Sequence, residues 1–229
     1  MRELRRFSVG TEILAGLGVI ETLHANVAAL EISKPALVCD QGLLRTGLLD
    51  GVLEQLGGAL AAAPISVAPE PTIEAAEKAA CVARGAEADG VVAVGGGSGL
   101  AVGKAVAAGL ANHVPLATLA GRDRARIRAA PVLAIPTTAG SGSEVSSVFV
   151  LQDPARPAAV VFQARHYAPR IALLDGDFLR SLPREPMLYA ALDALSHCLE
   201  ALWARGASTF SDALATRAAG QIHEMLPPA

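Results

Sequence analysis

Short apolar runs alternate with longer stretches of helical periodicity over the first three quarters of the chain. The apolar runs are continuous rather than alternating, which is typical of parallel strands buried on both faces. They lie at 36–40, 65–68, 90–95, 131–136 and 171–175. Helical spacing and length occur between them, at 42–57, 72–87 and 98–111. The repeated order of strand and helix predicts a parallel α/β sheet with helices on both faces.

The pattern changes after Leu182-Pro183. Before it, two apolar runs flank DPARP, whose Asp and Pro residues predict a β-hairpin over 146–163. Beyond it no strand pattern remains, and two helical runs follow, at about 185–204 and 208–226. We therefore expect an α/β domain over 1–182 and the beginning of an all-helical domain over 183–229.

The junction of the two helical runs carries its own signals. Gly206 suits the C-cap of the first helix, because glycine adopts the left-handed conformation without strain. Ser208 suits the N-cap of the second, where its hydroxyl can accept from a free amide.

Composition and charge are those of a globular protein with a large core. Hydrophobic residues make up 52% of the chain and charged residues 18%, and the net charge is −3. The one local excess of positive charge, Arg122 to Arg128, is predicted to be a solvated loop. The three cysteines are scattered, as in a protein of a reducing compartment. We expect a soluble, cytoplasmic protein that binds neither nucleic acid nor membranes.

A glycine-rich turn, GGGSGLAVGK at 95–104, follows one predicted strand and opens a helix. Consecutive glycines let the backbone approach a ligand closely, and the amides at a helix N-terminus favour a phosphate. The spacing is neither the GxGxxG fingerprint nor a GxxxxGK[ST] loop. The turn therefore predicts either a phosphate site or only a tight connection.

A second turn, PTTAGSGSEVSS at 136–147, is dense in hydroxyl groups. Its side chains could donate hydrogen bonds to a pyrophosphate or a ribose, or form a polar connection without a ligand; they are Thr137, Thr138, Ser141 and Ser143. Because both turns follow strands, they should meet at the carboxyl edge of the parallel sheet. Ligands bind at that edge in open α/β folds, which favours a nucleotide.

Two further residues belong to the same region of the predicted fold. Asp40 ends a strand, where a carboxylate can accept from ribose hydroxyls and repel a 2′-phosphate, or serve as a turn or cap residue. Lys104 lies on the helix that follows the first glycine turn, and is predicted to be a surface residue.

Asp193 and His197 lie four residues apart in the helical run 185–204. Side chains at i and i+4 share one helix face, so a carboxylate and an imidazole can converge on a divalent metal. The same spacing also suits a simple hydrogen-bonded pair. Glu200 and His223 lack a partner motif, and we do not expect them to be ligands.

These segments together resemble the iron-containing (group III) alcohol dehydrogenase family. The resemblance covers essentially the whole chain, and its specificity comes from the order of the motifs. They are FSVG, ALVCDQGL, EPTIEAAEKAACVARGAEADGVVAVGGGS, PTTAGSGSEVSS, LLDGDFLRSLP and DALSHCLEAL. The family implies a nucleotide-binding α/β domain, a helical domain and an active site between them.

The resemblance also implies roles for individual residues. Gly96, Gly97 and Ser98 would hold the pyrophosphate of NAD, with Thr137 and Thr138 also touching the cofactor. Asp40 would lie near the adenosine ribose and make NADP less favourable than NAD, while Leu174 and Phe178 would lie near the adenine. Asp193 and His197 would be two of four ligands of Fe²⁺ or Zn²⁺.

The implied activity is a metal-assisted, NAD(P)-dependent interconversion of an alcohol and an aldehyde or ketone, in a homo-oligomer. Two departures from the family pattern bear on it. Ala101 replaces the Asp of GGGSxxD, as in maleylacetate reductases, although AGSGSEV matches the alcohol dehydrogenases better. The other two metal ligands, both histidines, would lie beyond residue 229. We therefore expect this chain alone to bind metal weakly and turn over little, and a nucleotide-binding module without catalysis stays an alternative.

Overall fold

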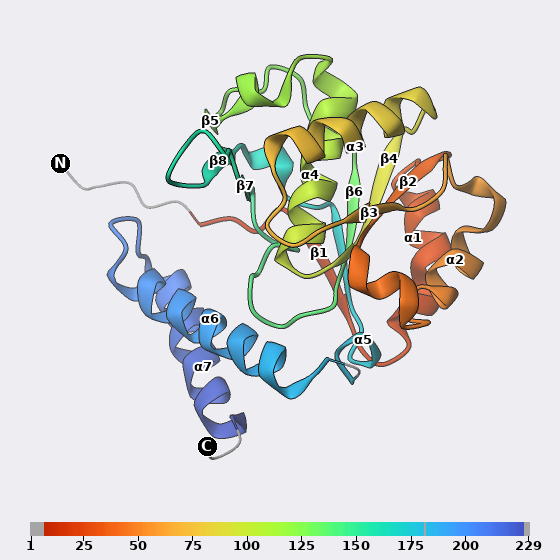
Figure 1. Cartoon of the computed structure of the whole chain (residues 1–229). Coiled ribbons are helices and arrows are strands. Elements are labelled where there is room, and N and C mark those ends of the chain that lie inside the picture. Colours follow the sequence, from red (N-terminus) through yellow and green to blue (C-terminus); the bar gives the residue numbers. More distant parts are fainter. Residues whose placement is uncertain (1–6, 181, 227–229) are drawn as a thin grey trace.

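Six parallel strands form the central sheet of the protein (Figure 1). The computed structural model describes residues 7–180 and 182–226. Across the sheet the strands follow the order β1-β9-β6-β4-β2-β3. They are β1 (Glu12–Ala15), β2 (Pro35–Asp40), β3 (Ile65–Val67), β4 (Gly90–Gly95), β6 (Val132–Pro136) and β9 (Ile171–Leu174). The predicted parallel α/β fold is confirmed, and β1 is an addition that the apolar pattern did not predict.

Helices cover both faces of this sheet. One face carries α3 (Ile73–Gly85) and α4 (Gly97–Asn112). The other carries α1 (Leu23–Ala29), α2 (Asp50–Leu56) and α5 (Asp177–Arg180). Short 3₁₀ helices complete the connections: η1 (Val19–Thr22), η2 (Gln41–Arg45), η3 (Gly57–Ala59), η4 (Leu116–Leu119) and η5 (Arg165–Tyr167).

The helix expected over 42–57 is wrong in its length. The segment contains η2 and α2, with a turn between them at Gly47. The φ of Gly47 is 75°, a left-handed conformation that a glycine adopts without the steric cost borne by other residues. The break therefore lies at the one residue of that turn with a positive φ.

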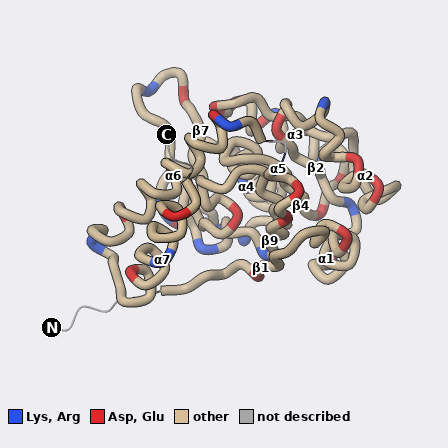
Figure 2. The backbone as a smooth tube through the Cα atoms, turned by 90° about the horizontal axis from the view of Figure 1, so that it is seen from below, with Lys and Arg blue, Asp and Glu red and all other residues tan. Residues whose placement is uncertain are grey.

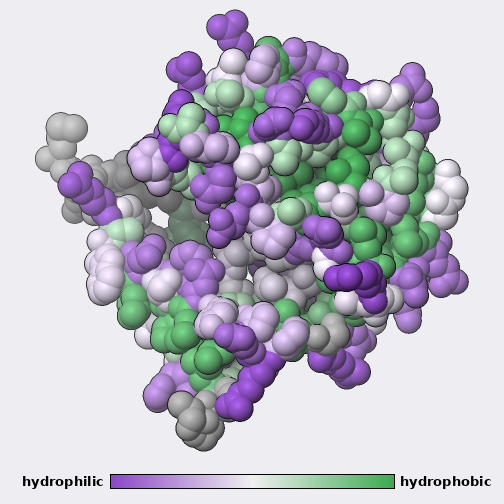
Figure 3. Space-filling view, viewed as in Figure 1, coloured by the Kyte–Doolittle hydropathy of each residue, from purple (hydrophilic) through white to green (hydrophobic). Residues whose placement is uncertain are grey.

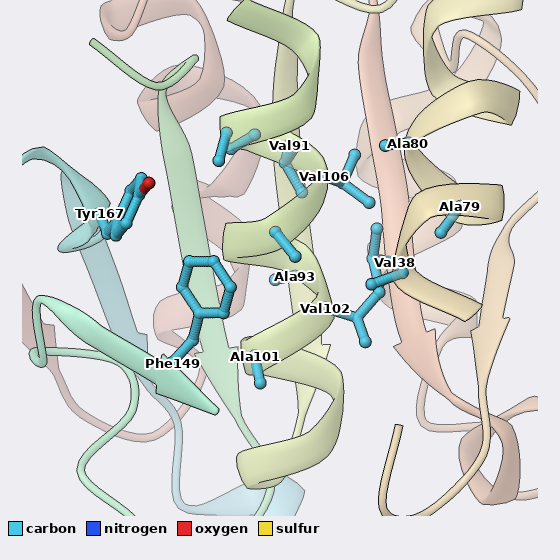
Figure 4. Packing of buried hydrophobic residues seen from close by; sticks show 14 of the residues in the cluster. Val38, Ala79, Ala80, Val91, Ala93, Ala101, Val102, Val106, Phe149 and Tyr167 are labelled. Carbon is cyan, nitrogen blue, oxygen red and sulfur yellow. The ribbon is translucent and has the colours of Figure 1, made fainter. Parts of the chain in front are cut away.

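The strand β4 illustrates why the apolar runs are continuous. Val91 and Ala93 point to the face of α3 and α4, whereas Val92 and Val94 point to the face of α1 and α2. All four are fully buried, because alternate residues of a strand face opposite layers and both layers are covered. Figure 4 shows the first of these two clusters, with alanines and valines of the helices packed on the strands.

A three-stranded sheet, of order β5-β8-β7, lies beside the main one. Its strands are β5 (Gly121–Arg122), β7 (Val148–Leu151) and β8 (Val160–Gln163). The antiparallel pair β7 and β8 confirms the predicted hairpin. Phe149 and Phe162 stack across it with ring centroids 4.7 Å apart, and both are buried. The hairpin is thereby fixed against the face that carries α4.

Two long helices, α6 (Arg184–Trp203) and α7 (Thr209–Met225), pack against each other beside the α/β body (Figure 1). Ser208 caps α7 as predicted: it forms a capping box with Ser211. The expected C-cap role of Gly206 is wrong, because α6 ends at Trp203 and its C-cap is Ala204 in an extended conformation. The chain leaves this helix by extending rather than by a left-handed turn.

The cysteines and the helix lengths can be read directly from the structure. Cys39, Cys81 and Cys198 are all free thiols, in keeping with the scattered positions in the sequence. In the described part of the chain, no helix combines the length and apolarity needed to span a bilayer.

Candidate functional site

The neighbouring strands β2 and β4 end at a topological switch point. From β2 the chain continues through η2 and α2 to β3, and from β4 it enters α4 on the opposite face and continues to β6. Such a divergence leaves a crevice at the carboxyl ends of the two strands, where open α/β sheets bind ligands. Asp40 ends β2 and the first glycine turn follows β4, so both predicted features lie at this crevice.

The carboxylate of Asp40 binds the N-terminus of α4. Oδ2 accepts from the amide of Gly96 at 2.6 Å, and the amide of Gly99 donates to the same carboxylate. Burial raises the pKa of Asp40, while these two backbone hydrogen bonds oppose the rise. Asp40 thus has the cap role that its position in the sequence left open, because its negative charge sits at the positive end of the helix dipole.

The glycines of the turn make room for that carboxylate. A Cβ added at Gly95 would lie 2.5 Å from Oδ2 of Asp40, and one added at Gly99 would lie 2.7 Å from Oδ1. Either side chain would displace Asp40. Two of the glycines are therefore explained by the Asp40 contact, whereas Gly97 faces the second turn, where its Cβ would lie 3.3 Å from Cβ of Ser141.

The second turn packs directly on the first. The amide of Thr137 donates to the carbonyl of Gly95 at 3.0 Å, and Thr137 is buried. The side chain of Thr138 lies beside Gly96. The two glycine-rich segments, separated by about forty residues of sequence, therefore form one continuous wall, as their shared place at the carboxyl edge predicted.

A cavity of about 450 Å³ opens against this wall. Gly97 and Ser98 line it from the first turn, Ser141 and Ser143 from the second, and His197 from α6. Its volume is within the range of small-molecule sites. The cavity brings together the glycine turn and one of the two predicted metal ligands, which come from different parts of the chain.

Asp193 and His197 lie on adjacent turns of α6, and each is half exposed. Oδ1 of Asp193 and Nε2 of His197 are 3.9 Å apart, too far for the hydrogen-bonded pair that the spacing also allowed. Two ligand atoms about 2.0 to 2.2 Å from a metal are about 3.4 Å apart in a tetrahedral shell, so the two side chains would have to approach each other by about half an ångström to share an ion. The described residues contain no group of three or more such side chains.

Lys104 is not the surface residue that was predicted. It is fully buried on α4, and its Nζ donates to the carbonyls of Ser146 at 3.0 Å and Val148 at 2.8 Å. Burial lowers the pKa of Lys104 to about 7, with Glu144 acting in the opposite direction. The lysine ties the end of the second turn and the start of β7 to the helix that begins at the first turn.

Leu174 and Phe178 lie at the end of β9 and on α5. Leu174 is half-buried, and Phe178 is buried in the core cluster on the face of α1 and α2. Neither lines the 450 Å³ cavity. The structure leaves their suggested contact with adenine as a prediction.

Several residues of the cavity had no signal in the sequence. Phe149 and Gln152 line it, but they come from the hairpin, which has no motif of its own, and Glu70 lines it as the first residue of a motif to which no site role was given. Their positions follow from the packing of the hairpin on α4. Ala101, which replaces the acidic residue of the family pattern, also lines the cavity.

Comparison with known proteins gives a family match and several relatives. The family model for iron-containing alcohol dehydrogenase matches residues 10–176. The 4-hydroxybutyrate dehydrogenase of Cupriavidus necator is 31% identical over 211 residues, which is 90% of this chain and 54% of that protein. The NAD-dependent methanol dehydrogenase of Bacillus methanolicus is 29% identical over 229 residues, or 99% of this chain and 60% of that protein.

Solved structures share the fold of this chain. Sulfoacetaldehyde reductase from Bifidobacterium kashiwanohense, in complex with NAD⁺, superposes with a TM-score of 0.90 at 25% identity, covering 98% of this chain and 60% of that one. An iron-containing alcohol dehydrogenase superposes with a TM-score of 0.87 at 31% identity, covering 98% of this chain and 62% of that one. This chain thus spans between half and two thirds of the length of these proteins.

Proposed function

Because the chain belongs to the iron-containing alcohol dehydrogenase family, we propose that it serves an NAD-dependent, metal-assisted interconversion of an alcohol and an aldehyde or ketone. The observation that carries this proposal is the cavity shared by Gly97, Ser98 and His197. A dinucleotide on the turn and a metal on α6 would face the same space.

The cofactor would bind along the carboxyl edge of the sheet. Gly96, Gly97 and Ser98 would hold the pyrophosphate at the N-terminus of α4, with the amides of Gly97 and Ser98 as donors, because the amide of Gly96 donates to Asp40. Thr137 and Thr138 would contact it from the second turn. We assign the adenosine ribose to the neighbourhood of Asp40, and the adenine to that of Leu174 and Phe178. In this division residues 1–182 form the nucleotide-binding domain, and 183–229 begin a helical domain.

Asp193 and His197 would hold Fe²⁺ or Zn²⁺. Such an ion would supply a Lewis acid for the substrate oxygen, and the nicotinamide would supply the hydride acceptor. The two side chains would fix the ion at the mouth of the cavity, and the serines of the second turn would orient the substrate and cofactor around it. The proposed setting is the cytoplasm, in a homo-oligomer, with a small alcohol or aldehyde as substrate.

Cofactor choice tests the nucleotide part of the proposal. We expect tighter binding of NAD than of NADP, because the Asp40 carboxylate repels a 2′-phosphate. Asp40→Asn keeps the shape of the side chain without its charge. It should lower the ratio of NAD affinity to NADP affinity about tenfold. Titration calorimetry measures both affinities, and Asp50→Asn, an exposed carboxylate on α2, is the matched control. Equal affinities in the parent would contradict the role of Asp40.

The place of the pyrophosphate is tested separately. Gly97→Val inserts a branched side chain against Ser141 and should weaken NAD binding by about tenfold or more. Gly220→Val, on an open surface of α7, controls for the substitution itself. Unchanged NAD affinity in Gly97→Val would place the nucleotide elsewhere.

The metal part has its own experiment. Two ligands on one helix leave the other positions of a tetrahedral shell to water or to other groups. We therefore expect this 229-residue chain to lose Fe²⁺ or Zn²⁺ on dialysis and to form little NADH from alcohols. Stoichiometric, tightly held metal with clear turnover would contradict this expectation and require ligands from another subunit.

A second activity is favoured by one residue. Ala101 lines the cavity. At this position the alcohol dehydrogenases commonly carry Asp, which the maleylacetate reductases also lack. Assay of the metal-supplemented protein with alcohols and with maleylacetate separates the two reactions. NAD binding with neither turnover indicates a nucleotide-binding module without catalysis.

A further inference from the structure

A second cavity, of about 520 Å³, lies at the opposite edge of the sheet. We call it the amino-edge cavity, because most of its residues come from the segments that precede β1, β6 and β9, while Val145 and Ser147 belong to the end of the second turn. It is lined by three arginines, a histidine and two serines among its polar side chains: Arg128, Arg165, Arg170, His166, Ser8 and Ser147. No carboxylate lines it among the described residues. Its polar lining is therefore cationic and rich in hydrogen-bond donors.

The backbone at Arg170 is fixed by the sheet, and the arginine side chains extend from it to exposed positions. The amide of Arg170 donates to the carbonyl of Val132 at 2.8 Å, and its carbonyl accepts from Glu12 at 2.9 Å. Arg170 is thus fixed between the first residues of β6 and β1. Arg165 belongs to η5, and Arg128 lies four residues before β6. Figure 2 shows Lys and Arg positions close to β1 and β9.

The charge of the three arginines is not balanced by ion pairs. Within residues 7–180 and 182–226, no carboxylate lies within ion-pairing distance of Arg128, Arg165 or Arg170. The nearby acidic groups are Glu31, which lines an adjoining cavity shared with Arg128 and Arg170, and Asp123, whose charge acts on His166. Like charges gathered around a hollow favour an anion there, because it relieves their mutual repulsion.

His166 also lines this wall, although its Nε2 is closed off from solvent. Its Nε2 is buried and has no hydrogen-bond partner among the described residues. Burial, and then the charge of Arg128, lower the pKa of His166, while Asp123 raises it. The ring is thus close enough to Arg128 to feel its charge, which places both on the same cavity wall.

We propose that the amino-edge cavity binds a small phosphorylated molecule, whose phosphate is held by Arg128, Arg165 and Arg170. The planar guanidinium group donates two parallel hydrogen bonds to phosphate oxygens, which makes arginine the preferred residue for such groups. Ser8 and Ser147 add hydroxyl donors, and the volume fits a ligand larger than the phosphate alone. This cavity shares no lining residue with the one formed by Gly97 and Ser98, although Ser147 ends the second turn, and it does not depend on the proposed dehydrogenase activity.

Titration calorimetry with pyrophosphate tests the site. Arg128→Gln and Arg170→Gln should each weaken pyrophosphate binding about tenfold, because each removes charge-assisted hydrogen bonds. Arg124→Gln is the matched control: this exposed arginine lies four residues before Arg128 but lines a different cavity, beside Asp123. The pyrophosphate affinity of Arg124→Gln should stay within about twofold of that of the parent.

Each other outcome overturns the proposal. If the parent binds neither pyrophosphate nor inorganic phosphate, or binds sulfate equally well, the cavity has no phosphate specificity. If both arginine variants keep the parent affinity, pyrophosphate binds elsewhere, the glycine turn included. If Arg170→Gln dissociates a dimer in size-exclusion chromatography without any phosphate effect, the edge is an interface between copies.

NAD affinity separates this inference from the proposed function. Arg170→Gln should bind NAD as the parent does, and a parallel loss of NAD affinity would contradict a separate site. A parent that fails to bind NAD contradicts the cofactor proposal alone, because the pyrophosphate comparison between variants is unaffected.

Discussion

The ammonium group of Lys104 is buried with two carbonyl acceptors and, in the described part of the chain, without an ion pair. Burial of an unpaired charge is costly, and the group responds by a pKa lowered from 10.5 to about 7. A neutral amine can still donate two hydrogen bonds, so the bonds to the carbonyls of Ser146 and Val148 remain after deprotonation. The lysine thus stabilises the second turn most effectively when it is uncharged.

The pH dependence of stability tests this state of Lys104. Between pH 7 and pH 10.5 the unfolded chain holds the proton that the folded chain has lost, so the free energy of unfolding should rise with pH. This one group contributes about 1.4 kcal/mol per pH unit in that window. Urea unfolding at several pH values gives the free energy of unfolding of the parent and of Lys104→Met. Plotted against pH, the two free energies should differ in slope by this amount.

The control for this experiment is Lys78→Met. Lys78 is exposed and pairs with Glu74 on the surface of α3. Its substitution should leave the pH slope of the parent intact. Parallel curves for the parent and Lys104→Met would mean that the buried ammonium keeps its charge in the folded protein.

At the scale of elements, α4 lies unusually close to the sheet. A Cβ added at Gly103 would lie 2.5 Å from Cβ of Ala93 on β4, and one added at Gly109 would lie 2.8 Å from Cβ of Ala80 on α3. These glycines allow the helix to approach both neighbours. The place of the first glycine turn follows from this packing, because α4 begins there.

Two alanine substitutions compare this packing with helix propensity. Gly103→Ala should lower the free energy of unfolding by about 1 to 3 kcal/mol, because the added methyl overpacks the contact with Ala93. Gly220→Ala, in an open part of α7, should raise it by up to about 1 kcal/mol, because alanine is the better helix former. Urea unfolding measures both changes in the free energy of unfolding. If both substitutions raised it, or both lowered it, the result would contradict the close approach of α4.

Elements with a local signal could be predicted, and those fixed by tertiary contacts could not. The continuous apolar runs indicate five of the six sheet strands, since burial on both faces leaves a pattern in the sequence. β1 gives no such signal: Glu12, Ile13 and Ala15 are exposed on an edge strand. The helix over 42–57 was too long because helical periodicity persists across the turn at Gly47.

The candidate site likewise has features that could be predicted from the sequence and features that could not. The two glycine turns could be placed together because strand order alone puts them at one edge. The bond from Asp40 to Gly96 and the burial of Lys104 depend on side-chain directions that no local pattern records. The amino-edge arginines come from separate segments, and in the sequence Arg128 is indistinguishable from the solvated arginines before it.

At the scale of the whole molecule, α6 and α7 expose an apolar surface. Large side chains on it are highly exposed, among them Trp203 at 74%, Phe210 at 68% and Leu214 at 59%. Figure 3 shows hydrophobic residues gathered over these two helices. A contiguous apolar surface of this kind favours association, because contact with another surface removes it from water.

We therefore expect this chain to self-associate as its concentration rises. Leu214→Lys should reduce light scattering at a given concentration, because it places a charge in the apolar surface. Val82→Lys is the control, since Val82 is an exposed but isolated apolar residue on α3. A monomer at all concentrations, or equal effects of the two substitutions, would contradict this role of the surface.

The edge position of β1 also sets the order of events during synthesis. β1 pairs only with β9, Glu12 opposite Ile171, and Thr11 and Gly18 bond to Pro169 and Asp175. At about 5 to 20 residues per second, a ribosome needs roughly ten to thirty seconds to make the intervening chain. During that time β1 lacks its neighbouring strand, and only Leu14, the one partly buried residue of β1, lacks the cover that it has in the folded protein. The core around β2 and β4 can form early, whereas the sheet closes only after β9 has left the ribosome.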